Sequence, residues 1–136
     1  MIKPIMKSEF FLRLPSEDAG PDDAATGQDL LDTLHEHERE CVGLAANMIG
    51  VRKRIICVKD GNRALLMYNP QILEQVNSYQ TSEGCLSLAG ERPCTRYRRI
   101  KVEYLDENFV HRIKNFSGYT AEIIQHEIDH CCGIVI

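Results

Sequence analysis

The residues best suited to chemistry are concentrated in one short run, from Gln125 to His130. On a helix, residues four apart project from the same face, so His126 and His130 can bind one metal ion. Glu127 lies one position along and can reach a water molecule that such an ion activates. This spacing is typical of metal-dependent hydrolases. The alternative is that the two histidines only pack or contact solvent.

A catalytic site of this kind needs a third protein ligand and one open position. The longer zincin pattern would place a histidine at the position of Ile136, so that pattern fails. Cys131 and Cys132 lie about 100° and 200° around the helix from His130, so neither shares its face. No acidic residue follows Asp129. The third ligand must therefore come from upstream.

Cys85 is the best upstream candidate. It lies in the segment Glu83–Ser87, where a glycine gives the loop the freedom to bring a thiolate close to an ion. The other candidate, His111, lies in a predicted strand, where we expect it to face solvent. We therefore expect Cys85, His126 and His130 to hold one divalent ion.

Three segments, in order along the chain, resemble the motifs of the peptide deformylase family. They are Gly43-Leu44-Ala45-Ala46, Glu83-Gly84-Cys85-Leu86-Ser87 and Gln125-His126-Glu127-Ile128-Asp129-His130. The resemblance runs from about residue 28 to the end. It implies an α+β fold with antiparallel β-sheets packed around a central C-terminal helix that carries the HExxH motif. It also implies a metal-dependent hydrolase that removes the formyl group from the N-terminal formylmethionine of nascent polypeptides.

The resemblance also implies a role for each site residue. Cys85, His126 and His130 would bind the metal, with Fe²⁺ as the physiological ion and Zn²⁺ found after aerobic handling. Glu127 would be the catalytic acid and base, and the N–H of Leu86 would stabilise the oxyanion. Gly43 would line the substrate through its backbone. The partner would be a formyl-Met peptide or nascent chain, which suggests a place near the ribosome.

One departure from the family pattern affects the chemistry. The family has a glutamine that donates to the oxyanion, and this chain has Met48 at that position. A thioether has no N–H to donate, so activity is expected to be weakened. Asn47 could replace the donor, although in an extended segment its side chain would point to the other face. The alternative function is a metal-binding homologue with little turnover, acting as a peptide-binding protein or on another small amide.

Length and composition support a single folded domain over residues 1–136, with 43% hydrophobic and 26% charged residues. The net charge of -4 gives no reason to expect direct binding to nucleic acid. No uncharged apolar run approaches the roughly 18 residues that a membrane helix needs. Met1–Pro4 lacks the apolar stretch of a secretory signal, so we expect a cytoplasmic protein whose six cysteines are thiols.

Hydrophobic spacing indicates which elements position these residues. Acidic and turn-forming residues predict an exposed connector over 15–27, and the spacing of Leu30, Leu31 and Leu34 predicts a helix over 28–40. Alternating or continuous apolar runs predict strands of an antiparallel sheet. These strands cover 54–59, 64–68, 100–105 and 109–114. A helical pattern begins at Tyr119 or Thr120, and Gly133 is expected to end it.

Overall fold

The computed structural model describes residues 1–135, so Ile136 at the end of the expected domain lies outside the described range. The described residues form five strands and five helical segments. The order is α1 (Glu9–Leu12), η1 (Pro21–Asp23), α2 (Ala24–Glu36), β1 (Gly43–Ala45), η2 (Ala46–Ile49), β2 (Ile55–Asp60), β3 (Arg63–Glu83), β4 (Arg92–Leu105), β5 (His111–Ser117) and α3 (Gly118–Cys131).

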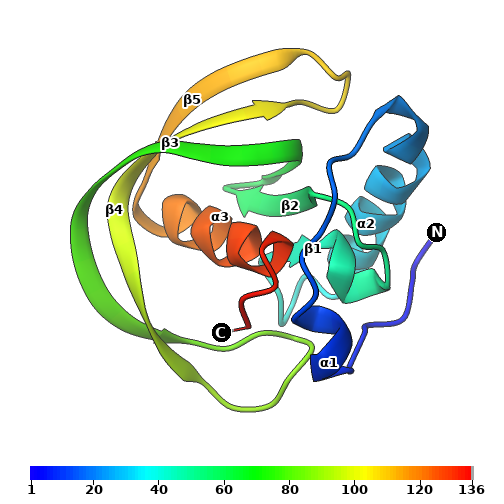
Figure 1. Cartoon of the computed structure of the whole chain (residues 1–136), viewed down its shortest axis with the longest axis horizontal. Coiled ribbons are helices and arrows are strands. Elements are labelled where there is room, and N and C mark those ends of the chain that lie inside the picture. The colour runs from blue at the N-terminus through cyan, green and yellow to red at the C-terminus, as the bar shows by residue number, and fades with distance from the viewer. Residues whose placement is uncertain (136) are drawn as a thin grey trace.

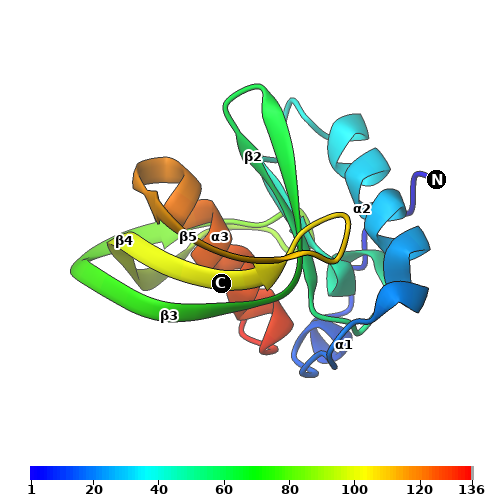
Figure 2. The ribbon, with the colours of Figure 1, turned by 90° about the horizontal axis from the view of Figure 1, so that it is seen from above.

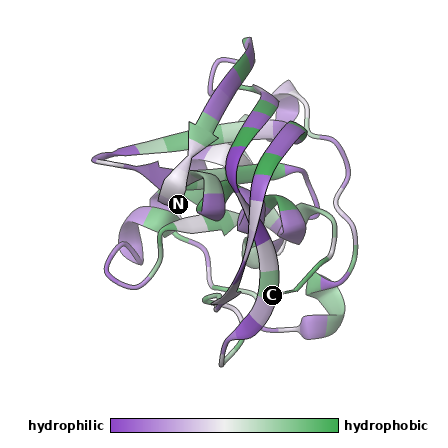
Figure 3. Cartoon of the chain, turned by 90° about the vertical axis from the view of Figure 1, so that its left-hand side faces the viewer, coloured by the Kyte–Doolittle hydropathy of each residue, from purple (hydrophilic) through white to green (hydrophobic). Residues whose placement is uncertain are grey.

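The five strands form one antiparallel sheet in the order β1-β2-β3-β4-β5. Its long strands β3 and β4 curve around α3, which crosses the middle of the molecule (Figure 1). Along the second half of β4, buried Ile100, Val102 and Tyr104 alternate with the less buried Lys101 and Glu103, as a strand with one buried face requires. Figure 3 shows hydrophobic and hydrophilic residues interspersed along the strands. The expected α+β fold with an antiparallel sheet around the C-terminal helix is therefore confirmed.

Strand β2 separates two hydrophobic clusters, because it is buried on both of its faces. Ile55 and Cys57 pack on the side of α2, in the cluster that contains Leu30 and Leu34. Ile56 and Val58 pack on the opposite side, in the cluster of α3. Figure 2 shows α2 and α3 on opposite sides of β2. The uninterrupted apolar run of this strand is thus explained by burial on both faces.

Several boundaries differ from those expected. Helix α2 begins at Ala24 and ends at Glu36, four residues earlier than predicted at each end, so the expected connector contains η1 and the first turn of α2. Strand β3 continues to Glu83 and β4 begins at Arg92, far beyond the predicted 64–68 and 100–105. Both strands continue because they pair with each other from Tyr68↔Leu105 to Glu83↔Arg92.

The two ends of α3 agree well with the sequence. The helix begins at Gly118, directly after β5, and Cys132 caps its C-terminus. Gly133 follows in the left-handed conformation, with φ of 76°, so it ends the helix as predicted. The six cysteines are free thiols. Among the described residues, no helix has both the length and the apolar character that crossing a membrane requires.

Candidate metal centre

Helix α3 brings three potential ligands together, as its sequence spacing predicts. The ligand atoms of His126, Glu127 and His130 all lie within 4.8 Å of one another, and all three residues are buried. The two imidazole rings have centroids 5.1 Å apart and meet at 63°. The alternative that both histidines contact solvent is therefore wrong.

His126 is oriented by a carboxylate from the end of β3. Its Nδ1 lies 2.8 Å from Oε1 of Glu83, which leaves Nε2 available for a metal. Burial opposes the charged form of His126, but the hydrogen bond to Glu83 and the nearby charge of Glu127 outweigh it and raise the pKa of the imidazole. A carboxylate bound to the second nitrogen is the usual support of a metal-binding histidine.

His130 and Glu127 carry polar atoms without protein partners. Both ring nitrogens of His130 and Oε1 of Glu127 are buried and accept or donate no hydrogen bond within the described chain. Burial, with repulsion from His126, lowers the pKa of His130 to about 3, so its imidazole is neutral near pH 7. Burial raises the pKa of Glu127 to about 7. Unpartnered buried nitrogens beside a carboxylate fit a bound divalent cation.

A network of charged side chains supports His126, and it joins Glu83, Arg96 and Asp129. Arg96, only 4% exposed, donates to both carboxylate oxygens of Glu83, at 2.8–3.1 Å, and to Oδ2 of Asp129 at 2.8 Å. Burial would raise the pKa of Glu83, but the hydrogen bonds from His126 and Arg96 hold it below its usual range. Asp129 thus forms an ion pair with Arg96 in this network.

The three sequence motifs meet at one pocket of about 660 Å³. They contribute Gly43 and Met48, then Glu83, Cys85 and Leu86, and finally His126 and Glu127. Cys85 lines this pocket without belonging to the close trio on α3. Five of the lining residues are glutamates, which favours a cation within the pocket.

Gly43 lies directly against the carboxylate of Glu127. A Cβ atom at this position would lie 2.9 Å from Oε2 of Glu127 and 2.7 Å from Cγ2 of Ile123, so the contact requires glycine. Gly43 belongs to β1, which is an edge strand of the sheet, and it pairs with Val58 of β2. The free edge of such a strand can pair with an extended peptide.

Asn47 and Met48 lie in η2, so the extended conformation expected around Asn47 is wrong. The Asn47 amide donates to the carbonyl of His130 at 2.9 Å and to that of Leu12 at 3.5 Å. It thereby connects η2 to the last turn of α3, where the His130 carbonyl also accepts from the N–H of Gly133 at 3.0 Å. Met48 is only 1% exposed and lines the pocket. The Asn47 side-chain amide thus donates to two backbone carbonyls of the protein, so it does not replace the donor that Met48 lacks.

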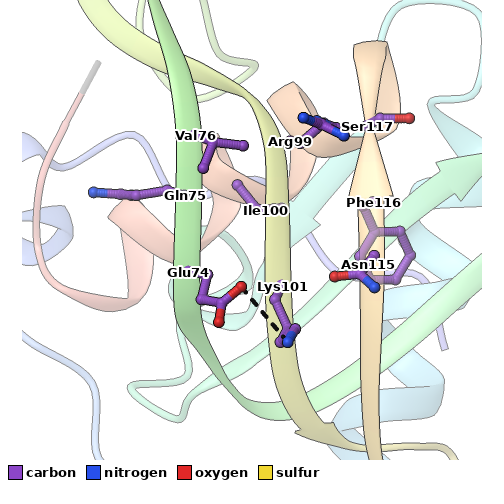
Figure 4. Close-up of a pocket in the computed structure, with 9 residues that line it drawn as sticks. All are labelled: Glu74, Gln75, Val76, Arg99, Ile100, Lys101, Asn115, Phe116 and Ser117. Carbon is purple, nitrogen blue, oxygen red and sulfur yellow. Dashed lines mark ion pairs between the residues drawn. The ribbon is translucent and has the colours of Figure 1, made fainter.

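A second pocket, of about 460 Å³, lies across β3, β4 and β5 (Figure 4). Its lining combines apolar Val76, Ile100 and Phe116 with the ion pair of Lys101 and Glu74, whose atoms lie 3.5 Å apart. None of the residues that line it belongs to the trio on α3. His111, the other ligand candidate, is exposed on β5 and contacts Glu103 at 3.0 Å. The chemistry is therefore concentrated at the first pocket.

A helix-borne trio of this kind beside a pocket defines the class of metal-dependent hydrolases. The family model for polypeptide deformylase matches residues 6–136. A peptide deformylase of Clostridium beijerinckii is 52% identical over 136 residues, covering 100% of both chains. Peptide deformylase 1 of Clostridium perfringens is 38% identical over 79% of this chain and 74% of its own.

Solved structures agree with this assignment. A class I type b peptide deformylase of Acinetobacter baumannii, with Met-Ala-Ser bound, has a TM-score of 0.87 and 31% identity over 99% of this chain and 97% of its own. The enzyme of Thermotoga maritima has a TM-score of 0.89 and 28% identity over 99% of this chain and 95% of its own. The chain belongs to the peptide deformylase family.

Proposed function

We propose that this protein removes the formyl group from the N-terminal formylmethionine of new polypeptides. The observation that carries the proposal is the close trio of His126, Glu127 and His130. Its unpartnered buried atoms belong to His130 and Glu127, and its members His126 and Glu127 line the pocket. Family membership supplies the substrate class. The bound Met-Ala-Ser of the Acinetobacter baumannii structure supports a peptide as the partner.

Cys85, His126 and His130 would hold one divalent ion in this proposal. A thiolate with two imidazoles suits Fe²⁺ and Zn²⁺, and we propose Fe²⁺ as the ion in the cell. When bound, such an ion supplies Lewis acidity to the reacting carbonyl and water. Glu83 would keep the His126 ring in the orientation that binding needs.

Glu127 would transfer the proton. Its pKa of about 7 allows it to accept a proton from water at neutral pH and to pass that proton to the leaving amine. Its Oε1 is buried without a partner, so no competing hydrogen bond within the described chain has to be broken first. The deprotonated water would attack the formyl carbon, and the bond from that carbon to the amine nitrogen would break. Formate and the free amine would then leave.

The backbone would hold and stabilise the substrate. The N–H of Leu86 would donate to the oxygen on which charge develops, and Gly43 would pair with the peptide along the edge of β1. Met48 contributes no donor, and the Asn47 amide is bound to His130. We therefore propose that this protein turns over more slowly than it would with a second hydrogen-bond donor to the oxyanion at position 48.

Met48 also favours a second candidate, a metal-binding homologue that binds peptides with little turnover. Formate release from a formyl-Met peptide, measured anaerobically with Fe²⁺, separates the two functions. The first predicts formate from the unmodified protein and almost none from Glu127→Ala. Peptide binding without formate release in any metal form would favour the second.

The ligand role of Cys85 has its own experiment. Cys85→Ser should lower the metal content of the purified protein, while Cys94→Ser, outside the pocket lining, should retain it. An unchanged one-to-one ratio in Cys85→Ser would remove Cys85 from the ligand set. A cytoplasmic location near the ribosome, where formylated chains emerge, stays a prediction.

A further inference from the structure

The N-terminal segment reaches the loop that carries Cys85 and Leu86. The ammonium of Lys7 donates to the backbone carbonyl of Leu86, with Nζ and O 2.7 Å apart. Two residues later, Oε1 of Glu9 lies 3.9 Å from Nη2 of Arg92. Arg92 is the first residue of β4 and follows the same loop directly. Figure 1 shows this loop beside α1.

The same segment is also fixed to Met48, another residue that lines the pocket. The backbone N–H of Met6 donates to the carbonyl of Met48 at 2.7 Å. Met6 and Leu86 both pack against the hydrophobic cluster that contains Met48. Two consecutive residues, Met6 and Lys7, therefore connect the Met48 wall of the pocket with the Leu86 wall.

The backbone of this loop constrains its own conformation only weakly, because glycines lie near both of its ends. Gly84 begins it and Gly90, with φ of 82°, lies near its end. Glycine permits many backbone conformations, so these positions do not fix the direction of the Leu86 N–H. A donor acts on a developing oxyanion only within a narrow range of positions, and an error of about 1 Å can cost 10²-fold in rate.

We propose that Lys7 is a positioning residue for the deformylase reaction, holding the Leu86 loop so that its N–H points at the substrate oxygen. The inference rests on the proposed function. Because Met48 offers no second donor, a misplaced Leu86 N–H would leave the oxyanion with no compensating hydrogen bond from that position. Lys7 itself does not touch the reacting atoms.

The test compares Lys7→Met, Lys7→Arg and Lys3→Met in the full chain. Lys3 lies on the same segment, but its ammonium is 3.9 Å from Asp29 on α2, so it is a matched control. Lys7→Met should lower kcat about tenfold with KM within twofold, and Lys7→Arg should restore most of kcat because it keeps a charged donor. Lys3→Met should leave kcat unchanged. An unchanged kcat in Lys7→Met, or an equal loss in Lys3→Met, would overturn the proposal.

Amide hydrogen exchange gives a readout that does not depend on activity. In Lys7→Met, the amides of Leu86 and Ser87 should exchange at least several-fold faster, while those of the 106–110 turn stay unchanged. Unaltered exchange at Leu86 and Ser87 would overturn the positioning role even if the protein deformylates well. Absence of formate release from the unmodified protein, with faster exchange in Lys7→Met, would instead contradict the proposed function alone.

Discussion

The imidazole of His126 and the carboxylate of Glu83 form a buried pair, with Nδ1 and Oε1 2.8 Å apart. Glu83 comes two residues before Cys85 in sequence, so one motif supplies both a proposed ligand and the support of another. The contact fixes the rotation of the imidazole and turns Nε2 toward the remaining candidate ligands. The second and third motifs are therefore physically coupled.

Glu83→Gln should weaken metal binding by about 10-fold or more, the lower end of the range typical for such supporting groups. The amide retains an acceptor but loses the charge that favours the bound imidazole. Competition with a chelator measures the affinity. Glu103→Gln is a matched control, since Glu103 makes a similar contact with exposed His111 at 3.0 Å. Equal affinities for the Glu83 variant and the unmodified protein would contradict this role.

Arg96→Met should lower the free energy of unfolding by about 3 kcal/mol, since removing one partner of a buried ion pair strands the other charges. Arg96 pairs with Glu83 and Asp129, and its side chain is only 5% exposed. Urea denaturation measures the change. Arg112→Met, at the more exposed pair with Asp106, should cost no more than about 1 kcal/mol. Similar losses in both variants would show that burial of the network adds nothing.

The raised pKa of Glu127 predicts how the metal-free protein responds to pH. Its value rises from 4.5 to about 7 on folding, so the folded protein binds the proton more tightly than the unfolded chain. This contribution to stability is complete below pH 4.5 and is lost as pH rises through 7. Glu127→Gln cannot ionise, so it should be more stable than the unmodified protein at pH 8, by up to about 3 kcal/mol.

Denaturation of both metal-free proteins at pH 4.5 and pH 8 checks this sign. At pH 4.5 the two stabilities should lie close together, because the Glu127 carboxyl is then largely neutral in the folded protein. A stability difference that is the same at both pH values would mean that the burial of Glu127 does not favour its protonated form.

Met48→Gln should raise turnover by about tenfold or more, because one oxyanion donor is typically worth 10²–10³ in rate. The gain should appear in kcat rather than in KM, since the added bond forms mainly in the transition state. Steady-state formate release, with metal content verified, gives both constants. If kcat does not increase in a folded, metal-loaded variant, the oxyanion is stabilised without a donor at this position.

Gly43→Ala should reduce both activity and stability. The added methyl would meet Oε2 of Glu127 and Cγ2 of Ile123 at less than 3 Å, so the Glu127 carboxylate or the β1 edge must shift. A kcat loss of about 10²-fold is expected from a displacement near 1 Å. Gly20→Ala is the control, because nothing lies within 4 Å of its added Cβ. Equal activity of the two variants would contradict the close approach.

The sequence predicted the elements whose residues follow a simple period. Helix α3 and the turn at Gly133 were predicted within two residues, and β2 was predicted from its apolar run. The continuation of β3 beyond Tyr68 was not predicted, because Asn69-Pro70 is a typical end of a strand. In the structure Asn69 adopts a positive φ of 53°, and its amide bonds to the backbone of Ala19 at 2.7 and 2.9 Å. That tertiary support lets the strand continue.

The proximity of His126, Glu127 and His130 could be predicted, because the two histidines lie four residues apart on one helix and Glu127 is next to the first. The support of this trio could not, since Glu83 and Arg96 come from two strands whose pairing depends on the unpredicted length of β3 and β4. A basic run such as Arg96-Tyr97-Arg98-Arg99 usually forms a solvated face. In the structure Arg96 is instead buried, where it pairs with Glu83 and Asp129, while Arg98 and Arg99 are exposed.

X-ray absorption at the metal edge of the Fe²⁺-loaded protein tests the central proposal most directly. The account predicts one sulfur and two imidazole nitrogens bound to a single ion, from Cys85, His126 and His130, with the remaining scatterer a light atom from solvent. A first shell of nitrogen and oxygen alone, or one with a second protein sulfur completing it, would contradict the account.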